Sequence, residues 1–272
     1  MKKHAFLLLT FASLALVSIT NANSATPICQ GKTPTIRGTN LAETITGTTR
    51  DDVIDGSGGN DIINGQGGND TICGGDGDDT ILGGAGKDSL NGGKGNDTID
   101  GNDGNDIITD DAGDDTINGN NGDDNISGGD GSDTIISGAG NDKVRGDDGN
   151  DVIIGGSNND SLSGGKGSDS ILGGNGIDDI DGGDDNDLLS GGNDNDVISG
   201  DAGKDTIYGD NGDDKINGGA GSDDISGDAG NDSIDAGTGL SDNCVRDGVN
   251  VDDSVLNCDS EDTSIELEKH DH

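Results

Sequence analysis

The sequence predicts an all-β fold, a right-handed parallel β-roll solenoid in which two short-stranded parallel sheets face each other in about ten coils of 18 residues. Three observations predict it. Residues 56–235 divide into twenty consecutive units of nine residues without an insertion or deletion. Every unit has Asp at its sixth position and Ile, Leu or Val at its eighth. Glycine occupies the first position in eighteen units and the fourth in seventeen.

Each unit combines a predicted turn with a predicted strand. Residues 92–100 read Gly-Gly-Lys-Gly-Asn-Asp-Thr-Ile-Asp. Positions seven to nine alternate polar, apolar, polar, which predicts a short strand with one buried side chain. Positions one to six are rich in Gly, Asn and Asp, which predicts a turn with positive φ angles. Where the second position is not Gly, it is usually one of the two residues that next best tolerate a left-handed backbone, as at Asn102, Asp111, Asn120, Asp147 and Asp201.

Stacking of the units predicts both the core and a cation site. One turn and one strand reverse the chain, so units of the same parity stack, and Ile63 is expected over Ile81. The same stacking brings Asp61 near Asp79, beside glycine carbonyl groups. Calcium takes six to eight oxygen ligands in flexible geometry, whereas zinc and copper prefer imidazole and thiolate, which the repeats lack apart from Cys73. Because the core is thin and the carboxylates repel one another, the chain is expected to be disordered without calcium and to fold when calcium binds.

The nonapeptide Gly-Gly-x-Gly-x-Asp-x-U-x, where U is a large aliphatic residue, carries a family resemblance. On this motif the chain resembles the RTX (hemolysin-type) calcium-binding repeat proteins over residues 47–235. The resemblance implies that the sixth-position Asp bridges stacked turns as a calcium ligand and that backbone carbonyls complete each site. Carried over, the implied metal ligands are Asp61, Asp70, Asp79, Asp88, Asp97, Asp106, Asp115, Asp124, Asp133, Asp142, Asp151, Asp160, Asp169, Asp178, Asp187, Asp196, Asp205, Asp214, Asp223 and Asp232.

Some units depart from the family motif. The fourth position is Asn158, Asp185 or Asp194 in three of them, where an altered turn geometry is expected. Many family members carry a C-terminal secretion signal and use a dedicated one-step channel. This chain instead begins with Lys2, Lys3 and an apolar run, which favours export by the general secretory route.

The segments outside the repeats complete the predicted organisation. Residues 1–22 read as a signal peptide, so a secreted, extracellular protein is expected; a buried N-terminal helix is the alternative. No other run is long enough to span a membrane. Residues 23–37 form a leader, and residues 38–55 are two degenerate units that cap the solenoid. Residues 236–272 are expected to be a C-terminal cap and an acidic tail.

Four cysteines in an exported chain favour disulfides over free thiols or a zinc site. Cys244 and Cys258 flank a short acidic loop and pair most simply. Cys29 then pairs with Cys73.

The amino-acid composition restricts the classes of partner and activity that can be expected. A net charge of -42 argues against nucleic acid and anionic membranes as partners and favours divalent cations. No His lies between residues 5 and 269, and neither flanking segment is large enough for a catalytic domain, so no enzyme is expected. His270 and His272 are read as solvated residues of the tail.

The sequence therefore predicts a secreted multivalent calcium-binding repeat protein with a structural, scaffold or buffering role. The alternative is a calcium-dependent carbohydrate-binding or adhesive module, whose partner would be an extracellular polysaccharide or a cell-surface component. Ice binding is less favoured, because the outward row of Thr80, Thr98, Thr116 and Thr134 is interrupted at Val152.

Overall fold

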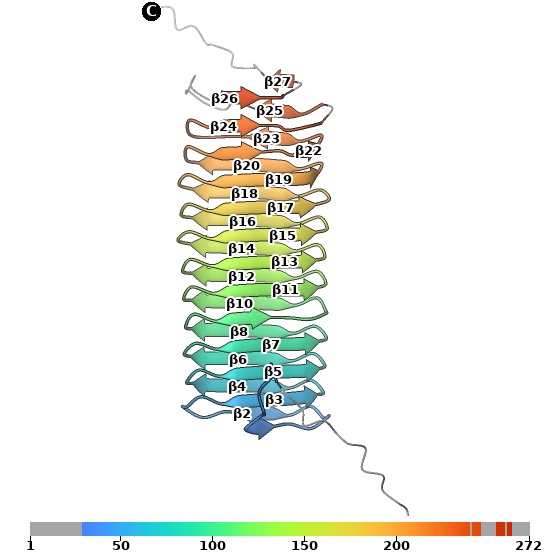
Figure 1. The fold of residues 1–272 in the computed structure, drawn as a ribbon, viewed down its shortest axis with the longest axis vertical. Helices are drawn as coiled ribbons and strands as arrows, with labels where there is room; N and C mark the ends of the chain where they lie inside the picture. The colour runs from blue at the N-terminus through green and yellow to red at the C-terminus, as the bar shows by residue number, and fades with distance from the viewer. Residues whose placement is uncertain (1–28, 240, 246–253, 259, 263–272) are drawn as a thin grey trace, which may run out of the picture.

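The computed structural model describes residues 29–239, 241–245, 254–258 and 260–262. Within these residues the chain is all β and contains no helix. The strands form two parallel sheets that face each other along an elongated solenoid (Figure 1), which confirms the predicted fold class. The predicted signal peptide and most of the acidic tail lie outside the described residues.

From β1 to β21, consecutive strands belong to opposite sheets, and each strand pairs with the strand two places away in the sequence. β22 shares the sheet of β21 and pairs with β19, so β20 pairs with β23 and β21 pairs with β24. The 14-stranded sheet contains β1 (Ile36–Arg37), β3 (Val53–Gly58), β5 (Thr71–Asp76), β7 (Ser89–Lys94), β9 (Ile107–Thr109), β11 (Asn125–Asp130), β13 (Lys143–Asp148), β15 (Ser161–Lys166), β17 (Asp179–Asp184), β19 (Val197–Gly203), β21 (Lys215–Asn217), β22 (Ala220–Gly221), β24 (Ser233–Asp235) and β26 (Ser254–Leu256). The 13-stranded sheet contains β2 (Thr44–Thr46), β4 (Ile62–Gly67), β6 (Thr80–Ala85), β8 (Thr98–Asp103), β10 (Thr116–Asn121), β12 (Thr134–Ala139), β14 (Val152–Ser157), β16 (Ser170–Asn175), β18 (Leu188–Asn193), β20 (Thr206–Asn211), β23 (Asp224–Ser226), β25 (Asn243–Val245) and β27 (Ser260–Asp262).

Most strands are six residues long, twice the predicted length. β6, for example, runs from the seventh position of one unit to the third position of the next. Its partner register passes from Leu82↔Asp100 to Gly84↔Asn102 and omits the intervening first-position glycine. Positions one to three of each unit, which are rich in glycine, were expected to form part of the turn. In the structure, the main chain of these residues continues the parallel pairing of the strands. The turn is therefore reduced to positions four to six.

Positive φ angles occur mainly at the second and fourth positions of the units. Among the predicted non-glycine cases, Asn102, Asn120, Asp147 and Asp201 have φ between 64° and 78°. Asp111 is the exception and does not adopt a positive φ. It follows Asp110, which replaces the first-position glycine, and β9 ends one residue earlier at Thr109. The backbone of this unit thus differs locally from that of its neighbours.

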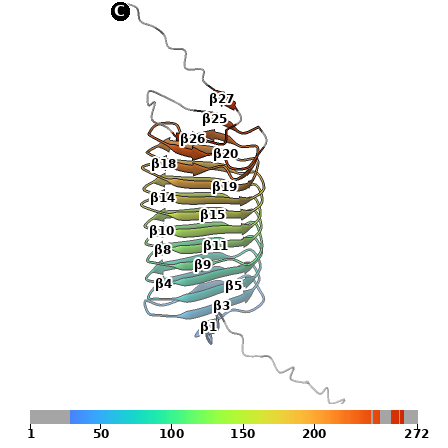
Figure 2. The same ribbon diagram turned by 45° about the horizontal axis from the view of Figure 1, so that its top comes forward.

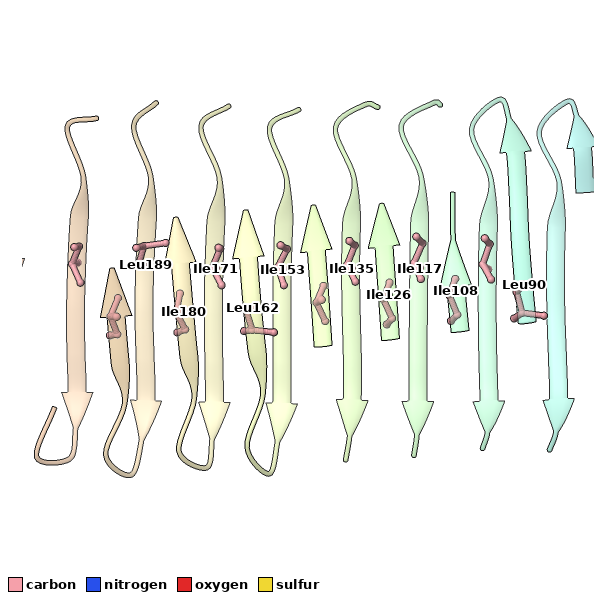
Figure 3. Packing of buried hydrophobic residues seen from close by; sticks show 14 of the residues in the cluster. Leu90, Ile108, Ile117, Ile126, Ile135, Ile153, Leu162, Ile171, Ile180 and Leu189 are labelled. Atoms are coloured by element: carbon pink, nitrogen blue, oxygen red, sulfur yellow. The ribbon is translucent and has the colours of Figure 1, made fainter. Parts of the chain in front are cut away.

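The core is a double file of aliphatic side chains between the two sheets (Figure 3). Ile63 pairs with Ile81, and Ile72 pairs with Leu90, each 18 residues apart as predicted. All twenty eighth-position side chains are buried. Ile45 and Ile54 extend the core into the degenerate units.

The pairing continues beyond the twenty units at both ends. β1 pairs with β3, so the solenoid begins inside the segment expected to be a leader. At the other end the register lengthens, because Asp224 pairs with Asn243 and Ser233 pairs with Ser254. Cys244 then takes the core position after Ile225. Figure 2, which tilts the C-terminal end forward, shows these last strands stacked on the roll.

Two disulfides tie the ends to the roll. Cys29 is bonded to Cys73 on β5, with the Cα atoms 5.7 Å apart. Lys32 donates a hydrogen bond to Thr71 Oγ1 (2.7 Å), so the N-terminal segment crosses the outer face of the sheet. Cys244 is bonded to Cys258, with the Cα atoms 6.0 Å apart.

Candidate metal centre

The sixth-position Asp side chains form two ladders, one along each long edge of the roll. Each Asp is the last residue of a turn and directly precedes a strand, as Asp61 precedes β4 and Asp70 precedes β5. Apart from β21 and β22, which share a sheet, successive strands belong to opposite sheets, so the turns alternate between the two edges seen in Figure 1. All twenty predicted ligand residues are buried, with at most 3% of each exposed.

One carboxylate oxygen of each ladder residue is fixed by the coil before it. The backbone N–H of Asp61 donates to Oδ1 of Asp79 at 2.7 Å, and that of Asp79 donates to Oδ1 of Asp97 at 2.6 Å. The same bond recurs along both edges. The ladder also reaches Asp242, because the N–H of Asp223 donates to its Oδ1 at 3.1 Å. Sequence reasoning missed Asp242 because the spacing there is 19 residues, outside the nine-residue period.

The second carboxylate oxygen has no hydrogen-bond partner within the described part of the chain. This holds for Oδ2 of Asp61, Asp70, Asp79, Asp88, Asp97, Asp106, Asp115, Asp124, Asp133, Asp142, Asp151, Asp160, Asp169, Asp178, Asp187, Asp196, Asp205, Asp214 and Asp223. A buried charged oxygen without a partner is costly. A repeated series of such atoms indicates a binding function.

The first-position glycines leave space beside these oxygens. A Cβ atom at Gly56 would lie 2.7 Å from Oδ2 of Asp61 and 2.5 Å from the carbonyl oxygen of Gly74, one coil further on. The carboxylate and carbonyl oxygens therefore face the same point. A side chain at this position would occupy the place where the two oxygens converge, which explains why eighteen of twenty units have Gly there.

The units with a non-glycine fourth position keep the turn conformation. Asn158, Asp185 and Asp194 have φ of 78°, 78° and 79°, so their backbone is left-handed like that of the glycines they replace. Asn and Asp tolerate this region better than other residues with a side chain. Their φ angles are nevertheless smaller than those of the positive-φ glycines at the fourth position, such as Gly68 (113°) and Gly104 (153°).

An outer row of side chains supports each turn. The N–H of Lys87 donates to Oδ1 of Asn69 at 2.8 Å, and the N–H of Asn69 donates to Oδ1 of Asp51 at 2.8 Å. Fifth-position Asn and Asp residues thus accept from the coil that follows. The frequent Asn and Asp at this position are the sequence signal for this row, which had no assigned role in the prediction.

Burial raises the pKa of most ladder carboxyls, although the N–H bond from the previous coil partly opposes the shift. Desolvation, with added repulsion from neighbouring carboxylates, raises the pKa of Asp97 and Asp151 from 3.8 to about 7. Desolvation likewise raises the pKa of Asp88 and Asp214 to about 6. Without a cation, the folded roll therefore binds protons more tightly than the unfolded chain does.

This shift predicts an acid-induced gain of structure in the calcium-free chain. An acid whose pKa is higher in the folded state contributes stability at low pH and loses it as pH rises, here between about 4 and 7. Lowering the pH of chelator-treated protein through this window should increase its β-sheet circular dichroism signal. A signal that falls on acidification would contradict this electrostatic account.

One unpredicted carboxylate joins the ladder. Asp110 lies at the first position of its unit, is buried, and has an Oδ2 without a hydrogen-bond partner. One oxygen each of Asp97, Asp110 and Asp115 lie within 4.8 Å of one another. Burial and the neighbouring Asp115 carboxylate raise the pKa of Asp110. The sequence signal was the loss of Gly at this position.

The donor set fits a hard cation. The oxygens that converge are carboxylate and carbonyl oxygens, and the ladder carries no imidazole. The four cysteines are all in disulfides and offer no thiolate. Oxygen-only, flexible coordination suits calcium better than zinc or copper, and magnesium requires stricter octahedral geometry.

A protein-family model matches most of the roll. The family described as RTX calcium-binding nonapeptide repeat (4 copies) matches residues 37–72, 74–108, 100–135, 109–144, 136–171, 145–180, 172–207 and 208–239. Together these matches span the roll from its first strand to the end of the regular repeats. No curated protein matches the chain.

Proposed function

The chain belongs to the family of RTX calcium-binding nonapeptide repeats, and on that basis we propose that it is a secreted protein that binds many calcium ions and folds when it binds them. The observation that carries this proposal is the double ladder of buried Asp Oδ2 atoms without hydrogen-bond partners. A ladder of this kind is stable only if each carboxylate is protonated or faces a cation.

The ladder couples binding to folding because its geometry exists only in the stacked roll. Asp61 and Asp79 are 18 residues apart in the sequence and meet only through the parallel pairing of β4 with β6. When bound, calcium supplies the positive charge that the row of carboxylates lacks. The unfolded chain offers no preformed site, so the binding free energy contributes directly to folding.

Export to a calcium-rich, oxidising compartment is the second part of the proposal. The predicted signal peptide at residues 1–22 supports it, and the two disulfides are of the kind that persist outside the cytosol. Among the described residues, no helix has the length and apolar character required to cross a membrane. We propose a structural, scaffold or buffering role and no catalytic activity, since the proposal assigns the buried carboxylates as cation ligands.

The test is a measurement of calcium stoichiometry with one ladder variant. Equilibrium dialysis of the full chain should give on the order of ten or more calcium ions per molecule, with much weaker binding of magnesium. Asp160→Asn removes a buried ladder charge and should lower the stoichiometry by about one or two ions. Asp179→Asn removes an exposed carboxylate from the outer face of β17 and should leave it unchanged.

The controls separate site binding from general charge. Equal losses in the two variants would mean that calcium merely screens the net charge of -42. Failure of the unmodified chain to bind calcium, or equal binding of magnesium, would refute the proposed function.

A further inference from the structure

The position of Asp110 gives one coil of the roll a different set of oxygen atoms. In a regular coil, the space next to a first-position glycine is bordered by its own unit's Asp Oδ2 and by the carbonyl oxygen of the first-position glycine one coil on, as at Gly56. At Gly92 the atoms nearest to an added Cβ are instead carboxylate oxygens of Asp97 and Asp110, with Oδ1 of Asp110 at 2.7 Å. A charged group from the next coil thus borders this space.

The Asp110 carboxylate is held in this place by the backbone. Its Oδ1 accepts hydrogen bonds from the N–H groups of Gly93 (2.8 Å) and Asp111 (2.9 Å). The N–H of Asp110 itself donates to the carbonyl of Ser127 at 2.9 Å. Oδ2 remains without a hydrogen-bond partner, and the side chain is 6% exposed. The early end of β9 and the absence of a positive φ at Asp111 accompany this arrangement.

Three carboxylates consequently face one another. One oxygen each of Asp97, Asp110 and Asp115 lie within 4.8 Å of the others. Oxygens that share a calcium ion lie about 2.3–2.6 Å from it, so two of them on opposite sides are separated by up to about 5 Å. The spacing of the three atoms therefore suits a single ion.

We propose that Asp97, Asp110 and Asp115 form a three-carboxylate calcium site that is distinct from the regular positions of the ladder and fills first as calcium rises. This inference rests on the proposed function of the ladder. The number of charged ligands is one of the factors that set calcium affinity in protein sites. Among the twenty units of residues 56–235, the third carboxylate is present only in this coil, because the other first-position replacement is Ser137, whose hydroxyl donates to the carbonyl of Gly155 at 2.8 Å.

The experiment is a calorimetric calcium titration of the full chain and three variants. Asp110→Gly restores the repeat motif and is expected to keep the fold, while Asp110→Asn keeps the shape and removes the charge. Ser137→Gly, the control, restores the motif at the other departure. The unmodified chain should show about one ion bound roughly tenfold or more tightly than the rest. Both Asp110 variants should lose this tight class, and Ser137→Gly should retain it.

The outcomes distinguish this inference from the proposed function. Retention of the tight class in Asp110→Gly, its absence from the unmodified chain, or its equal loss in Ser137→Gly would overturn the three-carboxylate site while the weaker class still supports the ladder. Absence of any calcium binding in the unmodified chain would overturn both. Circular dichroism of each variant in saturating calcium verifies that the roll has formed, so a lost tight class in a folded Asp110→Gly reports the site itself.

Discussion

Replacement of Gly68 by Ala is expected to destabilise the calcium-loaded roll by about 3 kcal/mol or more. Gly68 has φ of +113°, a backbone conformation that residues with a side chain rarely adopt. An added Cβ would lie 2.6 Å from the backbone nitrogen of Asp51. The clash is with main chain, so no side-chain movement relieves it. The coil must open locally, which also disturbs the neighbouring turns that stack on it.

Gly67→Ala is the matched control in the adjacent position. Its backbone does not have a positive φ, and the nearest atom to an added Cβ is the carbonyl oxygen of Ala85 at 3.4 Å. Urea unfolding in saturating calcium, followed by circular dichroism, should show a large shift for Gly68→Ala and little for Gly67→Ala. Similar shifts in the two variants would indicate that the close stacking of turns does not govern stability.

Truncation of a core side chain should have an effect of similar size. Ile63 is fully buried between the sheets, and Ile63→Ala is expected to cost about 2–5 kcal/mol, because the narrow core cannot collapse around the cavity. Its neighbour Ile62 points outward from the same strand and is 51% exposed, so Ile62→Ala should cost well under 1 kcal/mol.

The Ile63→Ala and Ile62→Ala variants can be compared by the calcium concentration that each needs in order to fold. In the proposed coupling, calcium binds the folded roll and not the unfolded chain, so destabilising the core raises the calcium concentration needed for folding. Ile63→Ala should raise the midpoint of calcium-induced folding, and Ile62→Ala should leave it close to that of the unmodified chain. A midpoint that is insensitive to Ile63→Ala would show that the aliphatic file does not take part in the coupled transition.

The nine-residue period was sufficient to predict the fold class, the aliphatic core and the stacking of the sixth-position Asp residues. Because the chain reverses at each turn, the aliphatic residue at the eighth position of each unit is expected to lie between the two sheets. The stacking of Asp61 on Asp79 then follows from the register of 18 residues.

Three features could not be predicted from the nine-residue period. Strand length was underestimated, because glycines that resemble a turn in composition can still pair through their main chain, as in β6. The C-terminal end departs from the 18-residue register, so Asp242 could not be assigned to the ladder. The proposed role of Asp110 as a third carboxylate involves a local backbone change, which the repeat motif does not describe.

The most direct test of the account compares the full chain with and without calcium at neutral pH, by far-ultraviolet circular dichroism and small-angle X-ray scattering. In a strong chelator we expect an expanded chain with a disordered spectrum. Addition of calcium should produce a β-sheet spectrum and the scattering of a compact rod. A β-rich rod that persists unchanged in the chelator would contradict the coupling of calcium binding to folding.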